Sequence, residues 1–522
     1  MRVAVIGFDS LDPGLVKHWA QTGHLPTFQK LFSKSAWAYV NNPRGFEAGT
    51  CWLSMWTGVL PDEHGIHDGF YVFDPREYRV RIARPEEIPE PFWMAASRSG
   101  RRLLLVDIPY TFLSPGINGV QLCDWLVHVR SDNERIHCHP ATLAGQIARD
   151  YGLNPWFTAN RCPGNEQDAY SVEGLSSIVD TLSSRAALKT RFCLDMLARA
   201  PWDLFFTVFH EGHDVGHMCW HGHDPSHERH DPKLTARVGD PLLSVYQKLD
   251  AATAALLDAL PPDAAVLVYT SHGIGPERTA SRFLDAILAR LDANPHPAKS
   301  RALADRLVPL YRRVVPAAVR RRIVPTVLGN QAYQWAAFDR RRRRRYFVLN
   351  SSYATGGVRF NVKGRDAHGI VEPGAELEQL MREVADGFRE MRNADTGEPL
   401  VEEITATSDL YQGSMRYLLP DLLLEWNKSH PIDRVSSPKI GEVKNDVVSV
   451  RSGDHATSKQ GLLFAPVAAG STGQQPEIHV IDIAPTLLNL LGVSDGLLAG
   501  KAIPFLVPGP GARYPHAVET GR

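Results

Sequence analysis

The sequence predicts an α/β/α sandwich around a mostly parallel sheet, and three observations lead to this prediction. Mainly apolar runs of strand length recur along the chain, at Val3–Phe8, Leu204–Phe209 and Ala264–Tyr269. Continuous runs of this kind are typical of parallel strands that are buried on both faces. Stretches of helical length separate the runs, and polar side chains follow each of them directly. In open α/β sheets, this carboxyl edge of the strands is where ligands bind.

Length and composition are those of a globular protein of ordinary type. The chain has 522 residues, of which 43% are hydrophobic and 22% charged, and its formal net charge is -1. This length predicts one large domain with insertions, or two domains. The near-zero charge gives no overall signal for a nucleic acid or a membrane surface. We find no apolar run of membrane-spanning length, no signal peptide and no C-x-x-C pair, so we predict a cytoplasmic protein with reduced cysteines.

The first strand ends in a carboxylate. Asp9 directly follows Val3–Phe8. A carboxylate at a strand end can bind a metal, and it can equally cap the following helix, since Ser10 and Asp12 are plausible residues for a helix start. Both roles remain open from this segment alone.

An apolar helix is predicted to start at Thr50 and to end near Gly58. As the first hydroxyl at the helix start, Thr50 can be a simple N-cap. It can also be a nucleophile at the positive end of the helix, where free backbone N–H groups receive a phosphoryl oxygen.

Imidazoles and carboxylates gather after two further strands. Leu204–Phe209 is followed by a cluster that contains Glu211, His213 and His217. His213 and His217 are four residues apart, so one turn of helix would place both rings on the same face. The strand near 264–269 leads to His272 in the same way.

Other elements are predicted from periodicity and flanking turns. Helices are expected at 25–32, 171–200, 250–260, 284–291, 376–391 and 480–492, and strands at 36–40, 103–106, 358–362, 420–426, 447–450 and 461–465. We find no internal repeat.

Residues 280–345 are predicted to form a basic, helical cap inserted into the main domain. Between residues 299 and 345 there are thirteen arginines and one lysine against two aspartates, a net charge of +12. This stretch can be a solvated cap, or an electrostatic funnel for an anionic substrate. Nucleic-acid binding is disfavoured, because the aromatic residues show no interleaved pattern for stacking.

Taken together, these motifs resemble the alkaline phosphatase superfamily, in its type I phosphodiesterase/nucleotide pyrophosphatase branch. The matching segments keep their order over nearly the whole chain. They are the opening strand with Asp9, Thr57-Gly-Val-Leu-Pro-Asp-Glu-His-Gly65, Glu211-x-His-x-x-x-His217, Ser271-His-Gly273, Gly453-Asp-His455 and Ile481-Asp-Ile-Ala-Pro-Thr-Leu-Leu488. The resemblance implies one catalytic domain over 1–279 and 346–510, with 280–345 as the cap.

The resemblance also implies a phosphate- or sulfate-ester enzyme with two neighbouring metal sites and a hydroxyl nucleophile. By this resemblance, His213, His217 and His455 form one metal site, and Asp9, Thr50 and His272 form the other. We therefore expect one or two Zn²⁺ ions, or zinc with a second divalent ion.

The chain departs from the family pattern at both metal sites. The first site usually has an aspartate where this chain has His213, and the second usually has Asp-His-Gly where it has Ser271-His-Gly. Three neutral imidazoles suit a zinc site with one open position. Loss of two carboxylates weakens binding of divalent ions, so a single zinc is a serious alternative. Glu211 or Asp214 could compensate at the first site.

The position of the nucleophile along the chain also differs from the family pattern. Counting back from Thr57-Gly58, the family position falls on Ala48, two residues before Thr50. We predict Thr50, because a two-residue shift in a loop is easily accommodated, with Cys51 as the next candidate. A sulfatase is disfavoured, because the C-x-P-x-R signature does not follow Cys51.

The sequence thus predicts a metal-dependent hydrolase or transferase that acts on a phosphodiester or phosphomonoester through Thr50. Arg451, Arg365 and Lys363 are candidates for pairing with an anionic small-molecule substrate. Two alternatives remain open: a single-zinc enzyme of this fold with non-phosphate ester, amide or group-transfer chemistry, and a binding protein without catalysis. The oligomeric state is not predicted.

Overall fold

A computed structural model gives the fold and describes eleven segments of the chain. These are residues 2–46, 49–127, 135–155, 169–292, 341–350, 354–445, 449, 451–455, 460–465, 472–494 and 498–506. Ala48, most of the strand predicted at 447–450, and most of the basic insertion (293–340) lie outside the described residues.

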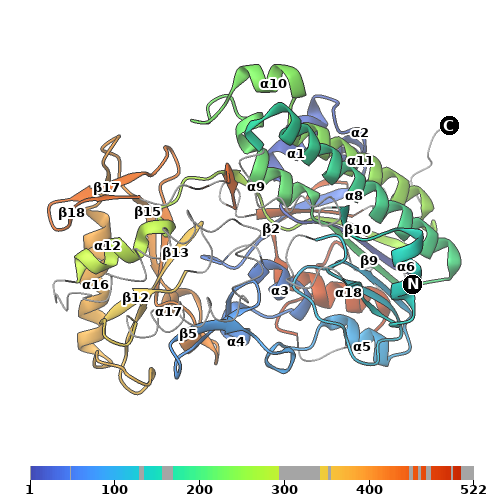
Figure 1. The fold of residues 1–522 in the computed structure, drawn as a ribbon. Coiled ribbons are helices and arrows are strands. Elements are labelled where there is room, and N and C mark those ends of the chain that lie inside the picture. The colour runs from blue at the N-terminus through green and yellow to red at the C-terminus, as the bar shows by residue number, and fades with distance from the viewer. Residues whose placement is uncertain are drawn as a thin grey trace.

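A large, mostly parallel sheet organises the chain, as the sequence predicts (Figure 1). Its strands are β1 (Val3–Phe8), β2 (Ala36–Asn41), β6 (Leu103–Val106), β7 (Gly119–Cys123), β8 (His137–His139), β9 (Leu204–Phe209), β10 (Ala265–Thr270), β20 (Gln460–Ala465), β21 (Gly473–Gln474) and β22 (Ile478–His479). The order is β21-β2-β20-β10-β1-β9-β6-β7-β8, with β22 also beside β2. Strands β10, β1, β9, β6 and β7 are parallel, and β20 and β8 pair antiparallel with their neighbours.

Helices cover both faces of this sheet, which confirms the predicted sandwich. One face carries α1 (Pro13–Gln21), α2 (Pro26–Lys34), α8 (Val172–Arg199), α9 (Glu211–His223) and α11 (Pro241–Ala259). The other carries α3 (Gly49–Thr57), α5 (Phe92–Arg98) and α18 (Ile483–Leu491). Along β1, Ala4, Ile6 and Phe8 join the first core, while Val3 and Val5 join the second. This alternation is what a strand with two buried faces requires.

Side-chain caps determine the starts of two helices, of which the first agrees with the predicted start at Asp12 and the second differs from the prediction. Helix α1 begins at Pro13, because the Asp12 carboxylate accepts the backbone N–H of Leu15 at 3.0 Å. Helix α11 begins at Pro241, nine residues before the predicted start at 250, and Asp240 caps it. An acidic N-cap followed by proline is a helix-start signal at both places.

A second, smaller sheet packs apart from the main one, with its own core. It consists of β12 (Tyr346–Val348), β13 (Thr355–Phe360), β16 (Leu422–Trp426) and β15 (Val401–Ala406), and its core includes α12 (Leu284–Leu291) and α16 (Ala375–Arg389). At the end of the arginine run, Arg344 pairs with Asp285 at 2.7 Å and Arg345 with Asp292 at 2.9 Å. These two arginines thus tie the second sheet to the region of α12. The domain boundaries themselves stay a prediction.

Short elements complete the described chain. They are α4 (Pro61–His64), α6 (Leu143–Asp150), α10 (Pro232–Val238), α17 (Thr407–Leu410), the sheets β3 (Ile66–Asp68)-β4 (Tyr71–Asp74)-β5 (Arg79–Ile82) and β14 (Arg392–Asn393)-β17 (Arg434–Ser437)-β18 (Gly441–Lys444), and the pair β11 (Gly275–Pro276)-β19 (Gly453–Asp454). No helix in the described segments is both long and apolar enough to cross a bilayer. The five described cysteines are buried and not disulfide-bonded.

Candidate metal centre and active site

The register of the three central strands brings their polar ends together. Phe8 of β1 lies opposite Thr270 of β10 on one side and Phe209 of β9 on the other. Asp9, His210 and Ser271 therefore follow at the same level of the carboxyl edge. Helix α9 starts immediately after β9, so its first turns stand over this edge.

Three imidazoles converge there, two from α9 and one from the segment after β19. Nε2 of His217 lies 3.2 Å from Nε2 of His213 and 3.1 Å from Nε2 of His455. All three side chains are buried, and their ligand atoms lie within 4.8 Å of one another. Nitrogens bound to one tetrahedral zinc ion at about 2.0–2.1 Å are separated by about 3.3 Å. The three residues therefore fit a zinc ion.

Hydrogen bonds at the other ring nitrogen, Nδ1, orient two of these imidazoles. Nδ1 of His217 lies 2.7 Å from the carbonyl oxygen of Gly453, and Nδ1 of His213 lies 3.3 Å from Oδ1 of Asp214. Both partners are acceptors, so each Nδ1 carries a proton and each Nε2 keeps a lone pair for the cation. Metal-bound histidines in proteins are commonly supported in this way.

Burial favours the neutral form of two imidazoles of the centre, His455 and His272, and a metal-binding imidazole must be neutral. Burial and the neighbouring imidazoles lower the pKa of His455 well below its usual range. Burial also lowers the pKa of His272 to about 4, although Asp9 acts in the opposite direction. At neutral pH both rings are uncharged.

Asp9 and His272 lie next to this cluster, and their surroundings differ from those of the three imidazoles. Oδ1 of Asp9 accepts hydrogen bonds from Trp52 Nε1 at 2.9 Å and from Ser271 Oγ at 3.3 Å, and it is 3.9 Å from Nε2 of His272. Among the described residues, the three-histidine group is the one set of three or more His, Cys, Asp or Glu side chains arranged for a metal. A second ion at Asp9 and His272 thus stays a prediction.

Ser10 connects the two halves of the centre, and sequence reasoning missed it. Its Oγ lies 2.8 Å from Nε2 of His272 and 3.3 Å from Nδ1 of His455. The sequence interpretation placed both Ser10 and Asp12 at a helix start, and only Asp12 caps the helix. A hydroxyl between the strand-end carboxylate and the true cap was the signal that could have identified it.

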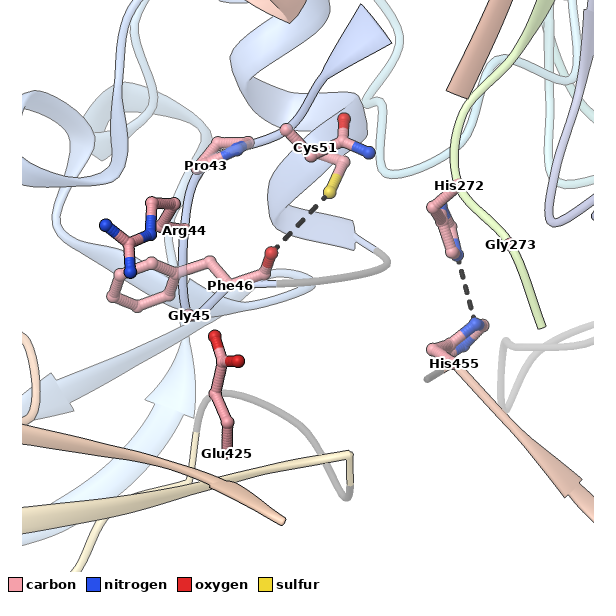
Figure 2. A pocket seen from close by; sticks show the side chains of 10 residues that line it. Pro43, Arg44, Gly45, Phe46, Cys51, His272, Gly273, Glu425 and His455 are labelled. Atoms are coloured by element: carbon pink, nitrogen blue, oxygen red, sulfur yellow. Dashed lines mark hydrogen bonds between the residues drawn. The ribbon is translucent and has the colours of Figure 1, made fainter. Parts of the chain in front are cut away.

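A small cavity of about 40 Å³ opens beside His272 and His455 (Figure 2). Its other lining residues are Asn42, Pro43, Arg44, Gly45, Phe46, Cys51, Gly273 and Glu425. A water molecule needs about 10–15 Å³ of such space, so the cavity has room for a group of a few heavy atoms. Glu425 comes from β16 of the second sheet, which therefore contributes one wall.

The two predicted nucleophiles are placed differently with respect to this cavity. Cys51 lines it, and its thiol lies 3.8 Å from the carbonyl oxygen of Phe46. Thr50 does not line it; the residue is fully buried and its Oγ1 has no hydrogen-bond partner in the described structure. Helix α3 begins at Gly49, so Thr50 lies within its first turn.

Glu211 lies in a buried ionic network behind the histidines. Oε1 of Glu211 is 3.3 Å from Nε of Arg185, and Oδ2 of Asp214 is 2.6 Å from Nη1 of the same arginine. Arg185 also donates to the carbonyl oxygen of Leu126 at 2.7 Å, and it is completely buried. Glu211 therefore connects the start of α9 to Arg185. Among the described groups it is not part of the three-histidine set.

Of the three residues predicted to bind an anionic substrate, only Arg451 lies near a histidine of the centre in the sequence. Arg451 lies four residues before His455, in the segment that carries this ligand. Arg365 pairs with Asp421 and with Asp366 inside the second sheet region, and Lys363 pairs with Glu372 at the surface. Arg365 and Lys363 do not line the cavity.

Replacing Asp214 with Asn is expected to weaken zinc binding about 10- to 100-fold, because the amide is a poorer acceptor for the Nδ1–H of His213. Competition with a chromogenic chelator measures the dissociation constant. Asp224→Asn, at the far end of α9 where the carboxylate accepts from Ser226, is the matched control and should bind zinc as the wild type does. Equal affinities for both variants would contradict this role of Asp214.

Comparison with known proteins agrees with this architecture. A family model described as type I phosphodiesterase / nucleotide pyrophosphatase matches residues 3–427. Among solved structures, phosphonoacetate hydrolase from Sinorhizobium meliloti 1021, in complex with phosphonoformate, is similar at a TM-score of 0.50 and 12% identity, over 94% of this chain and 96% of that chain. Human ectonucleotide pyrophosphatase / phosphodiesterase 5 gives 0.48 at 11% identity, over 96% and 97%. No curated protein matches the sequence.

Proposed function

The chain belongs to the type I phosphodiesterase / nucleotide pyrophosphatase family, whose members are hydrolases of the alkaline phosphatase superfamily, and we propose that it hydrolyses phosphodiesters with a single zinc ion. The observation that carries the proposal is the convergence of His213, His217 and His455 at tetrahedral spacing. These three residues would hold the ion. When bound there, zinc supplies positive charge that stabilises negative charge on the ester oxygens.

The charges of the described site favour a diester over a monoester. Three neutral imidazoles leave the charge of one zinc ion uncompensated, and a phosphodiester carries one negative charge where a monoester carries about two. Glu425 adds a carboxylate to the cavity wall, which disfavours the second negative charge. The guanidinium of Arg44, also in the wall, is already paired with Glu403 at 2.6 Å.

The attacking group is predicted from the sequence to be Thr50, with Cys51 as the alternative. Cys51 lines the cavity, whereas the Thr50 hydroxyl is buried away from it. Both stay candidates for mutation.

Metal analysis and turnover of the full-length protein test the function. We expect one equivalent of zinc, and faster hydrolysis of bis(4-nitrophenyl) phosphate than of 4-nitrophenyl phosphate. Removal of the ion with a chelator should abolish turnover, and added zinc should restore it. Two equivalents of metal with preferred monoester hydrolysis would contradict the single-zinc diesterase. One equivalent without hydrolysis of either ester would favour non-phosphate chemistry or a binding protein.

A further inference from the structure

A third histidine of α9 lies on the same side of the helix as the two that fit the zinc ion. His213, His217 and His221 are spaced by four residues, so consecutive turns place the three rings on one face. His213 and His217 meet the ring of His455, and His221 meets Ser452, three residues earlier in the same segment. This face of α9 thus contacts the segment around His455 at three successive turns.

Every polar group of Ser452 is hydrogen-bonded, and the residue is completely buried. Its backbone N–H donates to the carbonyl oxygen of His217 at 2.9 Å. Its carbonyl oxygen accepts the backbone N–H of Glu277 at 3.0 Å and lies 3.1 Å from Nε2 of His227. Its Oγ lies 3.0 Å from Nδ1 of His221. A buried polar network in which every group is satisfied holds the chain in a single arrangement.

The two histidines use different ring nitrogens, and their other contacts fix the position of each proton. Nε2 of His221 lies 3.1 Å from the carbonyl oxygen of Ala169, so this nitrogen carries the proton and Nδ1 accepts from Oγ of Ser452. Nδ1 of His227 accepts the backbone N–H of Arg229 at 3.0 Å, so Nε2 donates to the carbonyl oxygen of Ser452. Burial lowers the pKa of His221 to about 4 and also lowers the pKa of His227, so both rings are neutral at pH 7.

Arg229 holds the residues that come before this serine. Its Nη1 donates to the carbonyl oxygen of Ser449 at 3.0 Å, and its Nη2 donates to the carbonyl oxygen of Arg451. Side chains from the end of α9 and from the turn after it therefore bind the segment at several backbone positions before it reaches the metal centre.

The short distance along the chain from Ser452 to His455 makes this attachment effective. Strand β19 lies between the two residues and pairs with β11. A Cβ on Gly453 would lie 2.2 Å from the carbonyl oxygen of Gly216, so the strand passes in direct contact with α9. The carbonyl oxygen of Gly453 also accepts from Nδ1 of His217 at 2.7 Å. Because the backbone between them is extended and paired, the position of Ser452 sets the position of the His455 ring.

From these contacts we propose that His221 and His227 are positioning residues of the zinc centre, and that they act through Ser452 by placing the third ligand, His455. The proposal rests on the proposed single-zinc site. Both ring nitrogens of each histidine are engaged in hydrogen bonds, so the two rings hold the segment and do not compete for the ion. A ligand that is held in place before the ion arrives loses less conformational freedom on binding, which raises the affinity.

The zinc affinity of the full-length protein, measured by competition with a chromogenic chelator, tests the proposal. His227→Leu removes the N–H that the carbonyl oxygen of Ser452 accepts, and His221→Leu removes the acceptor for its Oγ. Each substitution should raise the zinc dissociation constant about 10- to 100-fold. His227→Gln keeps an N–H donor in place of Nε2, and it should bind zinc within about three-fold of the wild type.

His223 provides the matched control. It follows His221 by two residues on the same helix, and it pairs with Asp240 at 2.7 Å. His223→Leu removes an imidazole and its hydrogen bond from α9 without touching Ser452, and it should leave the zinc dissociation constant unchanged.

Hydrogen exchange of the metal-free proteins gives a readout that does not depend on zinc. We expect the peptide that contains Ser452 to exchange faster in His221→Leu and in His227→Leu than in the wild type. Peptides from β1 should exchange alike in all variants, because the central sheet does not depend on these contacts. Unchanged exchange of the Ser452 peptide in both leucine variants would contradict the proposal.

Wild-type zinc affinity in both leucine variants would overturn the positioning role and leave the zinc site intact. An equal loss of affinity in His223→Leu or in His227→Gln would also overturn it, because the loss would then not depend on the hydrogen bonds to Ser452. If a leucine variant fails to fold, Ser452→Ala decides, since it removes one of these bonds and keeps the backbone contacts. Its zinc dissociation constant should rise at least about three-fold, and an unchanged value overturns the proposal. A wild type that binds no zinc removes the proposed function, and this proposal with it.

Discussion

Replacement of His217 by Ala is expected to abolish zinc binding and to lower phosphodiester turnover at least about 1,000-fold, which corresponds to about 4 kcal/mol of transition-state stabilisation. His217 is the central member of the cluster, because its Nε2 lies within 3.2 Å of the ligand nitrogens of both His213 and His455. Two remaining imidazoles are fewer than the three protein ligands that catalytic zinc sites use. Elemental analysis of the purified variant and its turnover number check the prediction.

A histidine at the other end of the same helix provides the control. His223 pairs with Asp240 at 2.7 Å and does not belong to the three-histidine group. His223→Ala should keep one zinc and most of the turnover. A His217→Ala protein that retains stoichiometric zinc would show that the three rings do not form the metal site.

Replacement of Arg185 by Met is expected to lower the free energy of unfolding by about 3–5 kcal/mol. The side chain is completely buried, and it is the cation within 3.3 Å of both Glu211 and Asp214. Without it, two carboxylates remain in a low-dielectric environment, where an uncompensated charge is costly. Urea denaturation of the metal-free protein, followed by tryptophan fluorescence, measures the loss.

Removing one of the two carboxylates that lose their arginine partner should restore part of the lost free energy of unfolding. The double variant Arg185→Met/Glu211→Gln is expected to be more stable than Arg185→Met alone. Arg434→Met, which breaks an exposed pair with Asp395, is the surface control and should leave the urea midpoint unchanged. If both arginine variants unfold at the wild-type midpoint, the buried network does not contribute to stability.

The central sheet was predictable because its strands are buried on both faces. Such strands appear in the sequence as mainly apolar runs, and Val3–Phe8 and Leu204–Phe209 match β1 and β9 without a shift. The strands at the sheet edge were harder to identify. β8 has three residues, His137–His139, and depends on pairing with β7 rather than on a local pattern. Pairing of this kind is a tertiary contact that a single sequence does not display.

The candidate site was predictable to the extent that residues follow directly after central strands. The positions of Asp9 and of His213 with His217 came from that rule and from helical spacing. The contacts of Ser10 were not predicted, because they depend on a positive φ and on side chains 262 and 445 residues away. Arg185 was not predicted either, because a charged residue in a long helix is normally exposed.

The short strand β19, which His455 follows directly, relates the order of synthesis to the assembly of the centre. β19 pairs with β11, the N–H of Ser452 donates to the carbonyl oxygen of His217, and His455 meets a ring 238 residues earlier in the chain. Closing so long a loop carries an entropic cost that only the finished tertiary structure repays. In a nascent polypeptide the three-histidine cluster is therefore completed only after the segment around His455 has been synthesised, and an ion that needs all three rings could bind only then.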